Sequence, residues 1–144
     1  KEFVIDEWQI KHANQIGASG ILLIVSALDK KELNELFHCA IENNLTPLIE
    51  VHDEMEMEIA IDLGAKFIGI NNRNLKTFET SLDVTKNLLK QHPGDILVVS
   101  ESGIKTSEDV YELSSLGVNA LLVGEQLLKA ESPGNELRSL LSKL

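Results

Sequence analysis

The stretch Ile96-Leu97-Val98-Val99-Ser100-Glu101-Ser102-Gly103 changes abruptly from apolar residues to polar and small ones. An apolar run of this length is typical of a strand that is covered on both faces of a sheet. Thr106 and Asp109 follow with the spacing of a capping box, which predicts the start of a helix. The stretch therefore predicts a buried strand, a glycine turn and a helix in succession. Backbone N–H groups at such a turn can approach an anion.

The same strand-and-helix unit recurs along the chain. Apolar, β-branched-rich runs lie about 20 to 30 residues apart, which suits one strand, one helix and two short loops. They begin near Ile21, Thr46, Phe67, Ile96 and Ala120. Glycine follows the last helical turn in three places, as the left-handed C-cap signal. These places are Ile16-Gly17-Ala18, Leu63-Gly64-Ala65 and Leu116-Gly117-Val118.

The segments between the apolar runs have helical periodicity. Their aliphatic stripes predict core packing, and we interpret Trp8 and Cys39 as core residues too. We interpret His52 and Asp53 as structural, with Asp53 as an N-cap. The first helix is expected from Asp6 to Ile16. The later helices are expected to begin at Asp29, Asp53, Thr80, Thr106 and Ser132-Pro133.

Repeated βα units predict an α/β fold with a parallel sheet and outer helices. The residues Lys1 to Ile5 suggest the tail of one more strand, which makes about six βα units. Two architectures fit this pattern, an open doubly wound sheet or part of a (βα)8 TIM barrel. We expect one domain over residues 1–144, and both architectures place an active site at the carboxyl ends of the strands.

Composition excludes several classes of function. The 144 residues are 43% hydrophobic and 25% charged, which suits a globular core. The net charge of −10 argues against nucleic-acid binding, and any site for an anionic substrate must be locally positive.

No apolar run is long enough to span a membrane. The single Cys39 predicts a reducing, cytosolic location, and the spacing of His12, His38, His52 and His92 suggests no metal site.

Polar side chains follow most of the apolar runs. They include Glu50, Asn71-Asn72-Arg73-Asn74, Glu101 and Gly124-Glu125. A carboxylate at the mouth of a barrel loses hydration, so a purely structural reason for such positions is hard to find. In barrels the loops after the last two strands often hold a phosphate, with a short helix nearby, for which 126–130 is the right length. The residues alone thus predict an enzyme acting on a small phosphorylated anion.

These strand ends resemble those of the indole-3-glycerol-phosphate synthase family, the lyases of tryptophan biosynthesis. The resemblance runs the length of the chain, in order, and begins at the end of the family's third strand. It implies residues equivalent to strands three to eight of a TIM barrel. The matching strings are Lys1-Glu2-Phe3-Val4-Ile5-Asp6, Ile21-Leu22-Leu23-Ile24-Val25, Leu48-Ile49-Glu50-Val51-His52, Ile68-Gly69-Ile70-Asn71-Asn72-Arg73-Asn74-Leu75, Ser100-Glu101-Ser102-Gly103-Ile104 and Leu122-Val123-Gly124-Glu125.

The resemblance implies ring closure, decarboxylation and dehydration of 1-(2-carboxyphenylamino)-1-deoxyribulose 5-phosphate, with no cofactor or metal. In this reaction Lys1 would be the general acid, Glu50 a proton-transfer and charge-stabilising carboxylate, and Asn71 and Glu101 further active-site residues. Substrate-binding residues would be Arg73, Ser102, Gly103, Gly124 and Glu125. The family often has Ser at position 125, so we expect only the backbone N–H of Glu125 to serve, with its carboxylate pointing away from the phosphate.

Three expectations complete this interpretation. The family also uses a glutamate and a lysine on its first strand, so we expect little synthase activity from these residues alone. An unclosed barrel leaves strand edges unpaired, so we expect the chain to self-associate or to belong to a longer polypeptide. Two rival functions remain open: another phosphate-binding barrel enzyme, such as phosphoribosylanthranilate isomerase, and a non-catalytic barrel fragment with a residual anion site.

Overall fold

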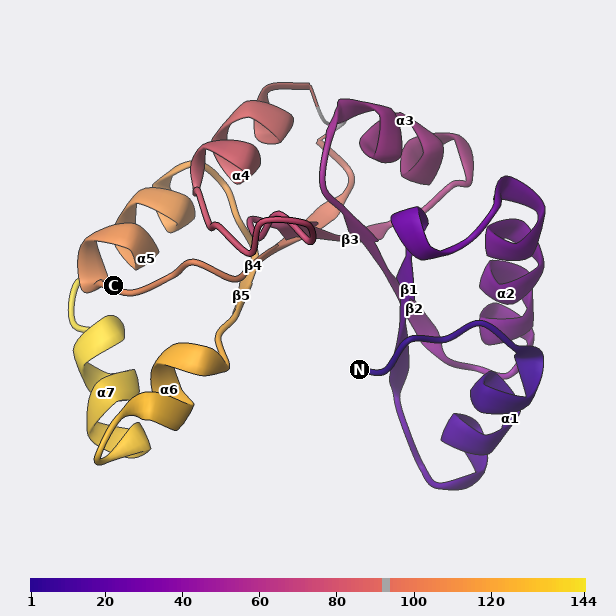
Figure 1. Ribbon diagram of the computed structural model, residues 1–144, viewed down its shortest axis with the longest axis horizontal. Helices are drawn as coiled ribbons and strands as arrows, with labels where there is room; N and C mark the ends of the chain where they lie inside the picture. Colours follow the sequence, from indigo (N-terminus) through magenta and orange to yellow (C-terminus); the bar gives the residue numbers. More distant parts are fainter. Residues whose placement is uncertain (92–93) are drawn as a thin grey trace. The chain divides into compact units, whose positions relative to one another are not determined.

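The computed structural model describes residues 1–91 and 94–144 and has alternating strands and helices (Figure 1). His92, one of the histidines considered above, lies outside the described residues. The elements are α1 (Glu7–Gln15), β1 (Gly20–Ile24), the 3₁₀ turn η1 (Val25–Ala27), α2 (Lys30–Glu42), β2 (Thr46–Val51), α3 (Glu54–Asp62), β3 (Phe67–Asn71), α4 (Asp83–Leu88), the 3₁₀ turn η2 (Leu89–Gln91), β4 (Leu97–Glu101), α5 (Ser107–Ser115), β5 (Ala120–Leu122), α6 (Glu125–Lys129) and α7 (Pro133–Leu140).

The strands form one parallel sheet in the order β1-β2-β3-β4-β5. In the first pair Ile24 is opposite Glu50, and in the last pair Glu101 is opposite Leu122. Sequential order is the order of a (βα)8 barrel, whereas a doubly wound sheet reverses direction at a switch point. The topology thus favours the barrel alternative.

The chain divides into two compact units, residues 1–69 and 70–144, and the division falls within β3. In the first unit α2 packs on β1 and β2, and α1 lies beside α2 (Figure 1). Fully buried aliphatic side chains such as Leu23, Ile49 and Ile68 form its core. The single domain expected from the sequence stays a prediction.

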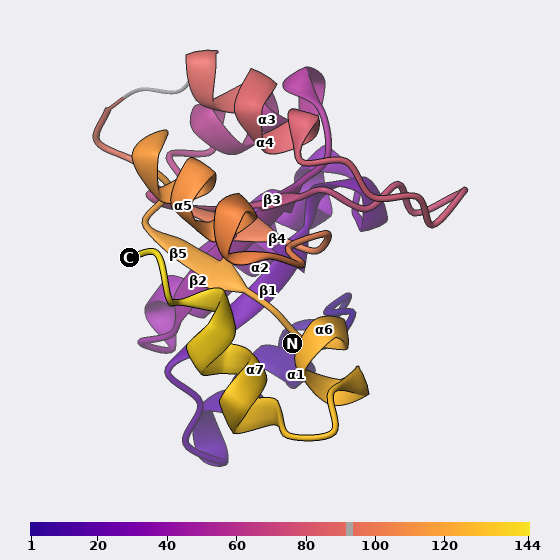
Figure 2. The same ribbon diagram turned by 90° about the vertical axis from the view of Figure 1, so that its left-hand side faces the viewer.

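The second unit has a separate apolar cluster. Ile104, Val110, Leu113 and Leu140 are buried in it, so α5 and α7 are held together by side chains from both helices. Figure 2 shows α7 beside α5, with α6 next to it. This packing fixes the segment that carries Gly124 and Glu125 against the body of the unit.

Most predicted helix starts are confirmed, and one is wrong. Asp29 and Thr106 each form a complete capping box, and Asp53 accepts a hydrogen bond from the Glu56 N–H. Thr80 is not an N-cap, because it forms an isolated antiparallel bridge with Arg73, and α4 begins three residues later at Asp83. The three predicted glycine C-caps, at positions 17, 64 and 117, all have positive φ.

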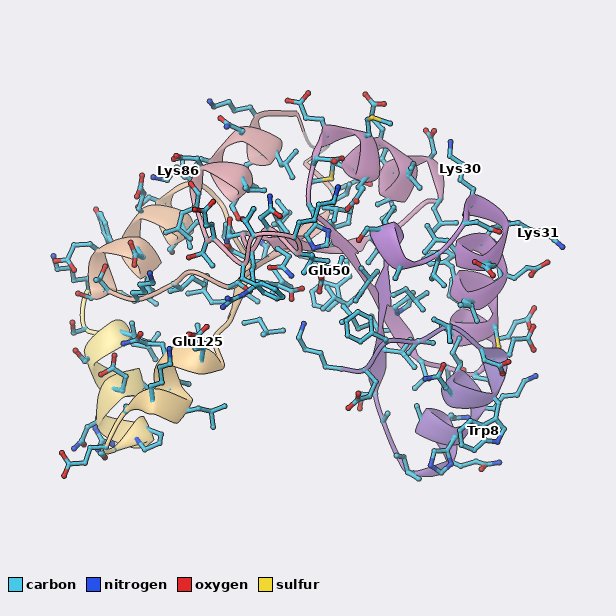
Figure 3. All side chains as sticks on the ribbon, in the orientation of Figure 1. Trp8, Lys30, Lys31, Glu50, Lys86 and Glu125 are labelled. Atoms are coloured by element: carbon cyan, nitrogen blue, oxygen red, sulfur yellow. The ribbon has the colours of Figure 1, made fainter. Side chains whose placement is uncertain are left out.

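Two further predictions near the N-terminus are wrong. Lys1 to Ile5 have no strand assignment, because the Gln9 side chain binds the Ile5 N–H and the Phe3 carbonyl while it caps α1. Trp8 is 66% exposed on α1 rather than part of the core, and its ring stacks on His12 (Figure 3). Cys39 is buried, as predicted.

No helix within the described ranges is long and apolar enough to cross a membrane. The cytosolic location expected from the sequence stays a prediction.

Candidate active site

Glu50 is a buried carboxylate at the end of β2. Only 3% of the residue is exposed, and the strand holds it opposite Ile24 of β1. The Lys1 ammonium lies 3.6 Å from its Oε2 atom. A buried carboxylate is stable only when charged or hydrogen-bonding groups compensate for its lost hydration. The structure thus brings together Lys1 and Glu50, the two residues that the resemblance makes the central acid and carboxylate.

His52 completes this cluster, although the sequence analysis interpreted it as structural. His52 comes directly after the last residue of β2, two positions from Glu50, and continued strand alternation places the two side chains on the same face. Its Nε2 atom lies 3.3 Å from Glu50 Oε1, and its Nδ1 atom lies 3.0 Å from Glu56 Oε2. Glu56 also accepts a hydrogen bond from the His52 N–H. The imidazole is therefore held between two carboxylates.

These carboxylates change the charge of the histidine. The close contact with the Glu50 carboxylate, and then the hydrogen bond to Glu56, raises the pKa of His52 to about 9, although partial burial opposes the shift. His52 is therefore an imidazolium at neutral pH. Two cationic groups, the Lys1 ammonium and the His52 imidazolium, therefore flank the buried Glu50 carboxylate.

Asn72 joins the carboxyl ends of β3 and β4. Its side-chain amide, in a residue only 2% exposed, donates to the Ser100 hydroxyl and the Glu101 carbonyl, each at 2.9 Å, and to the Ser102 carbonyl at 3.1 Å. Its side-chain oxygen accepts from the backbone and hydroxyl of Thr85. All the polar groups of this amide are satisfied, which fixes the path of the chain through Glu101 and Ser102.

Asn72 is not among the site residues predicted from the sequence. An Asn-rich turn indicates that hydrogen-bonding side chains are present, but it does not indicate which of the amides is buried. Asn71, the one selected, is also buried at 9% exposure, and its side chain accepts a hydrogen bond from the Arg73 N–H. Glu101 is 1% exposed at the end of β4. Asn71, Glu101 and their neighbours thus form a second polar group, in the unit of residues 70–144.

The backbone after β4 turns through two left-handed residues. Ser102 has φ of 63° and Gly103 has φ of 77°. A Cβ atom on Gly103 would lie 3.1 Å from the Thr80 Cβ, which is closer than ordinary van der Waals contact. Glycine is therefore favoured at position 103 for two reasons, the sign of φ and the approach of the 73–80 loop.

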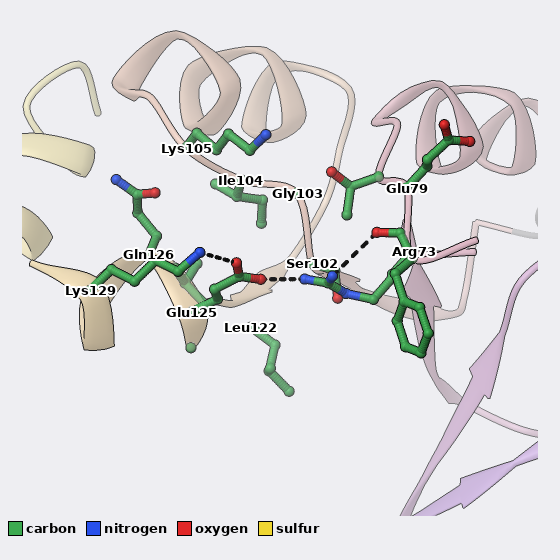
Figure 4. A pocket seen from close by; sticks show the side chains of 14 residues that line it. Arg73, Glu79, Ser102, Gly103, Ile104, Lys105, Leu122, Glu125, Gln126 and Lys129 are labelled. Carbon is green, nitrogen blue, oxygen red and sulfur yellow. Dashed lines mark hydrogen bonds and ion pairs between the residues drawn. The ribbon is translucent and has the colours of Figure 1, made fainter. Parts of the chain in front are cut away.

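A pocket of about 490 Å³ opens beside this turn (Figure 4). It is lined by the five residues that the resemblance assigns to substrate binding, namely Arg73, Ser102, Gly103, Gly124 and Glu125. Lys105 and Lys129 also line it, so the described lining has three cations against the carboxylates of Glu79 and Glu125. The pocket is locally positive in a chain with a net charge of −10, which is the condition that an anion site requires.

The Glu125 carboxylate lies within the pocket, whereas the sequence analysis expected it to point away from a phosphate there. It forms an ion pair with the Arg73 guanidinium and another with the Lys129 ammonium, 2.5 Å away (Figure 4). The Lys129 and Arg73 cations lower the pKa of Glu125, so it is ionised at neutral pH. Attraction to two cations is the physical reason for its inward orientation.

No group of three or more His, Cys, Asp or Glu side chains in residues 1–91 and 94–144 is arranged to hold a metal ion. The absence of a metal and of an organic cofactor, expected from the sequence, stays a prediction.

Comparison with known proteins identifies the family of the chain. The sequence matches the family described as indole-3-glycerol phosphate synthase over residues 1–140. The chain belongs to the indole-3-glycerol phosphate synthase family. A synthase of Alkaliphilus metalliredigens is 49% identical over 144 residues, which are 100% of this chain and 55% of that protein. A synthase of Acetivibrio thermocellus is 49% identical over 138 residues, 96% of this chain and 53% of that protein.

Solved structures agree on the fold. The 3-hexulose-6-phosphate synthase of Salmonella typhimurium has a TM-score of 0.80 and 16% identity, over 98% of this chain and 71% of that one. KGPDC from Streptococcus mutans has a TM-score of 0.68 and 15% identity, over 96% of this chain and 67% of that one. At these identities the likeness concerns the fold alone, which is α/β and part of a (βα)8 barrel. The chain spans about half the length of the synthases that it matches.

Proposed function

We propose that the protein carrying these residues is a carbon–carbon lyase. It converts 1-(2-carboxyphenylamino)-1-deoxyribulose 5-phosphate to indole-3-glycerol phosphate, carbon dioxide and water in tryptophan biosynthesis. Membership of the synthase family over residues 1–140 is the observation that carries the proposal. The Lys1–Glu50 pair and the locally positive pocket support it, because the reaction needs an acid, a charge-stabilising carboxylate and a phosphate site.

Ring closure is the step that we assign to Lys1. The aryl carbon that bears the carboxylate forms a bond with the ketose carbonyl carbon, and the carbonyl oxygen takes a proton. The Lys1 ammonium supplies that proton as general acid. The ring nitrogen gains positive charge at this point, and the Glu50 carboxylate stabilises it.

The remaining steps restore the aromatic ring. The bond to the carboxylate breaks, carbon dioxide leaves, and its electron pair neutralises the cation. A hydroxyl group then leaves as water while the neighbouring CH₂ loses a proton, and Glu50 takes part in that transfer. Asn71 positions the substrate, and Glu101 acts as a further carboxylate of the active site.

We assign the phosphate of the substrate to the pocket of residues 70–144. Arg73 supplies a guanidinium that can bind phosphate through two N–H groups, and Ser102, Gly103 and Gly124 supply backbone N–H groups. The three cations of the pocket support this assignment, because a phosphate ester carries about two negative charges at neutral pH.

Product formation tests the proposal. The whole natural polypeptide that contains these residues is incubated with the carboxyphenylamino sugar phosphate, and indole fluorescence is followed. Phosphoribosylanthranilate is the comparison substrate, because an isomerase would act on it instead. We expect turnover of the first substrate only. The 144-residue chain alone should be at least about 100-fold slower, because its relatives are about twice as long. Absence of indole product from the whole polypeptide would overturn the proposal.

We also propose that the 144-residue chain self-associates. β1 ends the strand order and therefore has an edge open to pairing, and Phe3, Ile5 and Trp8 expose about two-thirds of their surfaces nearby in the sequence. Such edges and apolar side chains favour association with a second copy.

A further inference from the structure

One carboxylate in the pocket is bound to the cations that a phosphate would need. Glu125 lies at the start of α6, Lys129 lies one turn later, and Arg73 comes from the loop after β3 (Figure 4). The carboxylate therefore links two cations from separate elements of the same unit. Both cations line the pocket together with Ser102 and Gly103.

Internal contacts occupy both terminal nitrogens of the Arg73 guanidinium. Nη1 donates to the Phe78 carbonyl at 3.3 Å, and Nη2 binds the Glu125 carboxylate. A guanidinium binds carboxylate and phosphate with the same planar set of N–H groups. A phosphate that binds Arg73 through the Nη2 N–H now directed at Glu125 must take the place of that carboxylate.

We infer that Glu125 is an internal anion that competes with the substrate phosphate for Arg73 and Lys129. This inference rests on the proposed function, because it concerns the phosphate pocket of that reaction. Binding then exchanges one anion for another, and the Glu125 side chain turns out of the pocket. The phosphate ester that enters is a dianion, and the Glu125 carboxylate that it displaces is a monoanion. The exchange therefore favours phosphate esters over small carboxylates of similar size.

The exposure of the pair sets the size of the effect. The Glu125 side chain is 54% exposed and that of Arg73 is 28% exposed, so solvent weakens their attraction. Ion pairs of this kind are weak enough for a phosphate to displace, yet two of them together change affinity measurably. We expect the competition to weaken phosphate binding roughly threefold to tenfold.

Isothermal titration with inorganic phosphate tests the inference in the whole natural polypeptide, at pH 7.5 and fixed ionic strength. Glu125→Gln keeps the size of the side chain and removes its charge, so the Kd for phosphate should fall roughly threefold to tenfold. Glu79→Gln is the matched control. It removes one negative charge from the same pocket, but Glu79 points away from Arg73 (Figure 4). Its effect should stay below about twofold.

A third comparison separates the effect of the Glu125–Arg73 ion pair from the general effect of removing a negative charge from the pocket. In an Arg73→Gln background the gain from Glu125→Gln should shrink, because one of the two competing ion pairs is gone. Equal gains from the Glu79 and Glu125 variants, or no gain from Glu125→Gln in a protein that binds phosphate, would overturn the inference and leave the proposed function intact. No phosphate binding by any of the variants would also overturn the inference, whereas the proposed function is tested separately by indole formation. Thermal unfolding of each variant identifies any loss of folding.

Discussion

His52 Nε2 lies 3.3 Å from Glu50 Oε1, while the other ring nitrogen lies 3.0 Å from Glu56. Lys1 approaches Glu50 from the N-terminal segment, so Lys1, Glu50, His52 and Glu56 form a charged cluster. One cation bound by two carboxylates is charged over a wider pH range than an isolated histidine. The cluster therefore links the stability of the first unit to pH.

The first prediction concerns that pH dependence. The pKa of His52 rises from 6.5 to about 9 on folding, so between these values the folded state holds a proton that the unfolded state has lost. The stabilisation is complete below pH 6.5 and is lost as pH rises through 9. Urea unfolding should show that His52→Asn costs about 1–3 kcal/mol more at pH 6 than at pH 9.5.

His12→Asn is the control, because His12 is exposed and is not part of this cluster. Its effect on the free energy of unfolding should differ little between the two pH values. Equal destabilisation by His52→Asn at both would contradict the assigned charge of His52.

The second prediction concerns the Asn72 amide. Asn72→Ala removes the buried hydrogen bonds that its amide makes to Thr85, Ser100 and Glu101, so the free energy of unfolding should fall by about 2–4 kcal/mol. Chemical denaturation measures the change. Asn14→Ala, at an exposed position of α1, should change it by less than about 0.5 kcal/mol. Similar effects of the two substitutions would contradict the role of Asn72 in joining β3 and β4.

The third prediction concerns Gly103. Gly103→Ala places a Cβ atom against Thr80 at a residue with positive φ, which should destabilise the chain by about 1–3 kcal/mol and weaken phosphate binding. Gly134→Ala meets no atom within 4 Å and lies in α7, where alanine is the better helix former. That control should be neutral or slightly stabilising in thermal unfolding. A Gly103→Ala variant as stable as Gly134→Ala would show that the turn is not constrained.

The fourth prediction concerns self-association of the 144-residue chain. Sedimentation velocity should show larger species as the concentration rises towards about 100 µM. Phe3→Ser should reduce them, because Phe3 is 68% exposed and apolar. A monomer at every concentration would contradict the proposal.

The repeat of strand, helix and glycine was enough to predict the fold class, because the ends of each helix in a βα unit are marked by residues close in the sequence. Gly17, Gly64 and Gly117 mark helix ends by their own backbone preference, and Asp29 and Thr106 mark helix starts by short-range hydrogen bonds. Trp8 was misjudged because an apolar side chain on a helical face indicates burial only when another element covers that face.

The site was only partly predictable from sequence. The alternation of a strand explains why Glu50 and His52 share a face, but the contact with Glu56 depends on where α3 begins. The Glu125 carboxylate turns inward because Arg73, more than 50 residues earlier, lies across the pocket. The sequence does not distinguish Asn71 from Asn72, because both are asparagines in the same turn. Only the three-dimensional path of β4 shows that Asn72 forms the link to that strand.

The most direct test of the central claim, that Glu50 acts in the lyase reaction, is kcat for indole formation by the Glu50→Gln variant of the whole natural polypeptide. We predict a fall of at least about 100-fold, because the substitution removes a charge-stabilising and proton-transfer group. Glu58→Gln, at an exposed position of α3, should stay within about twofold of the original protein. A Glu50→Gln enzyme that keeps a kcat within about twofold of the original would contradict the account.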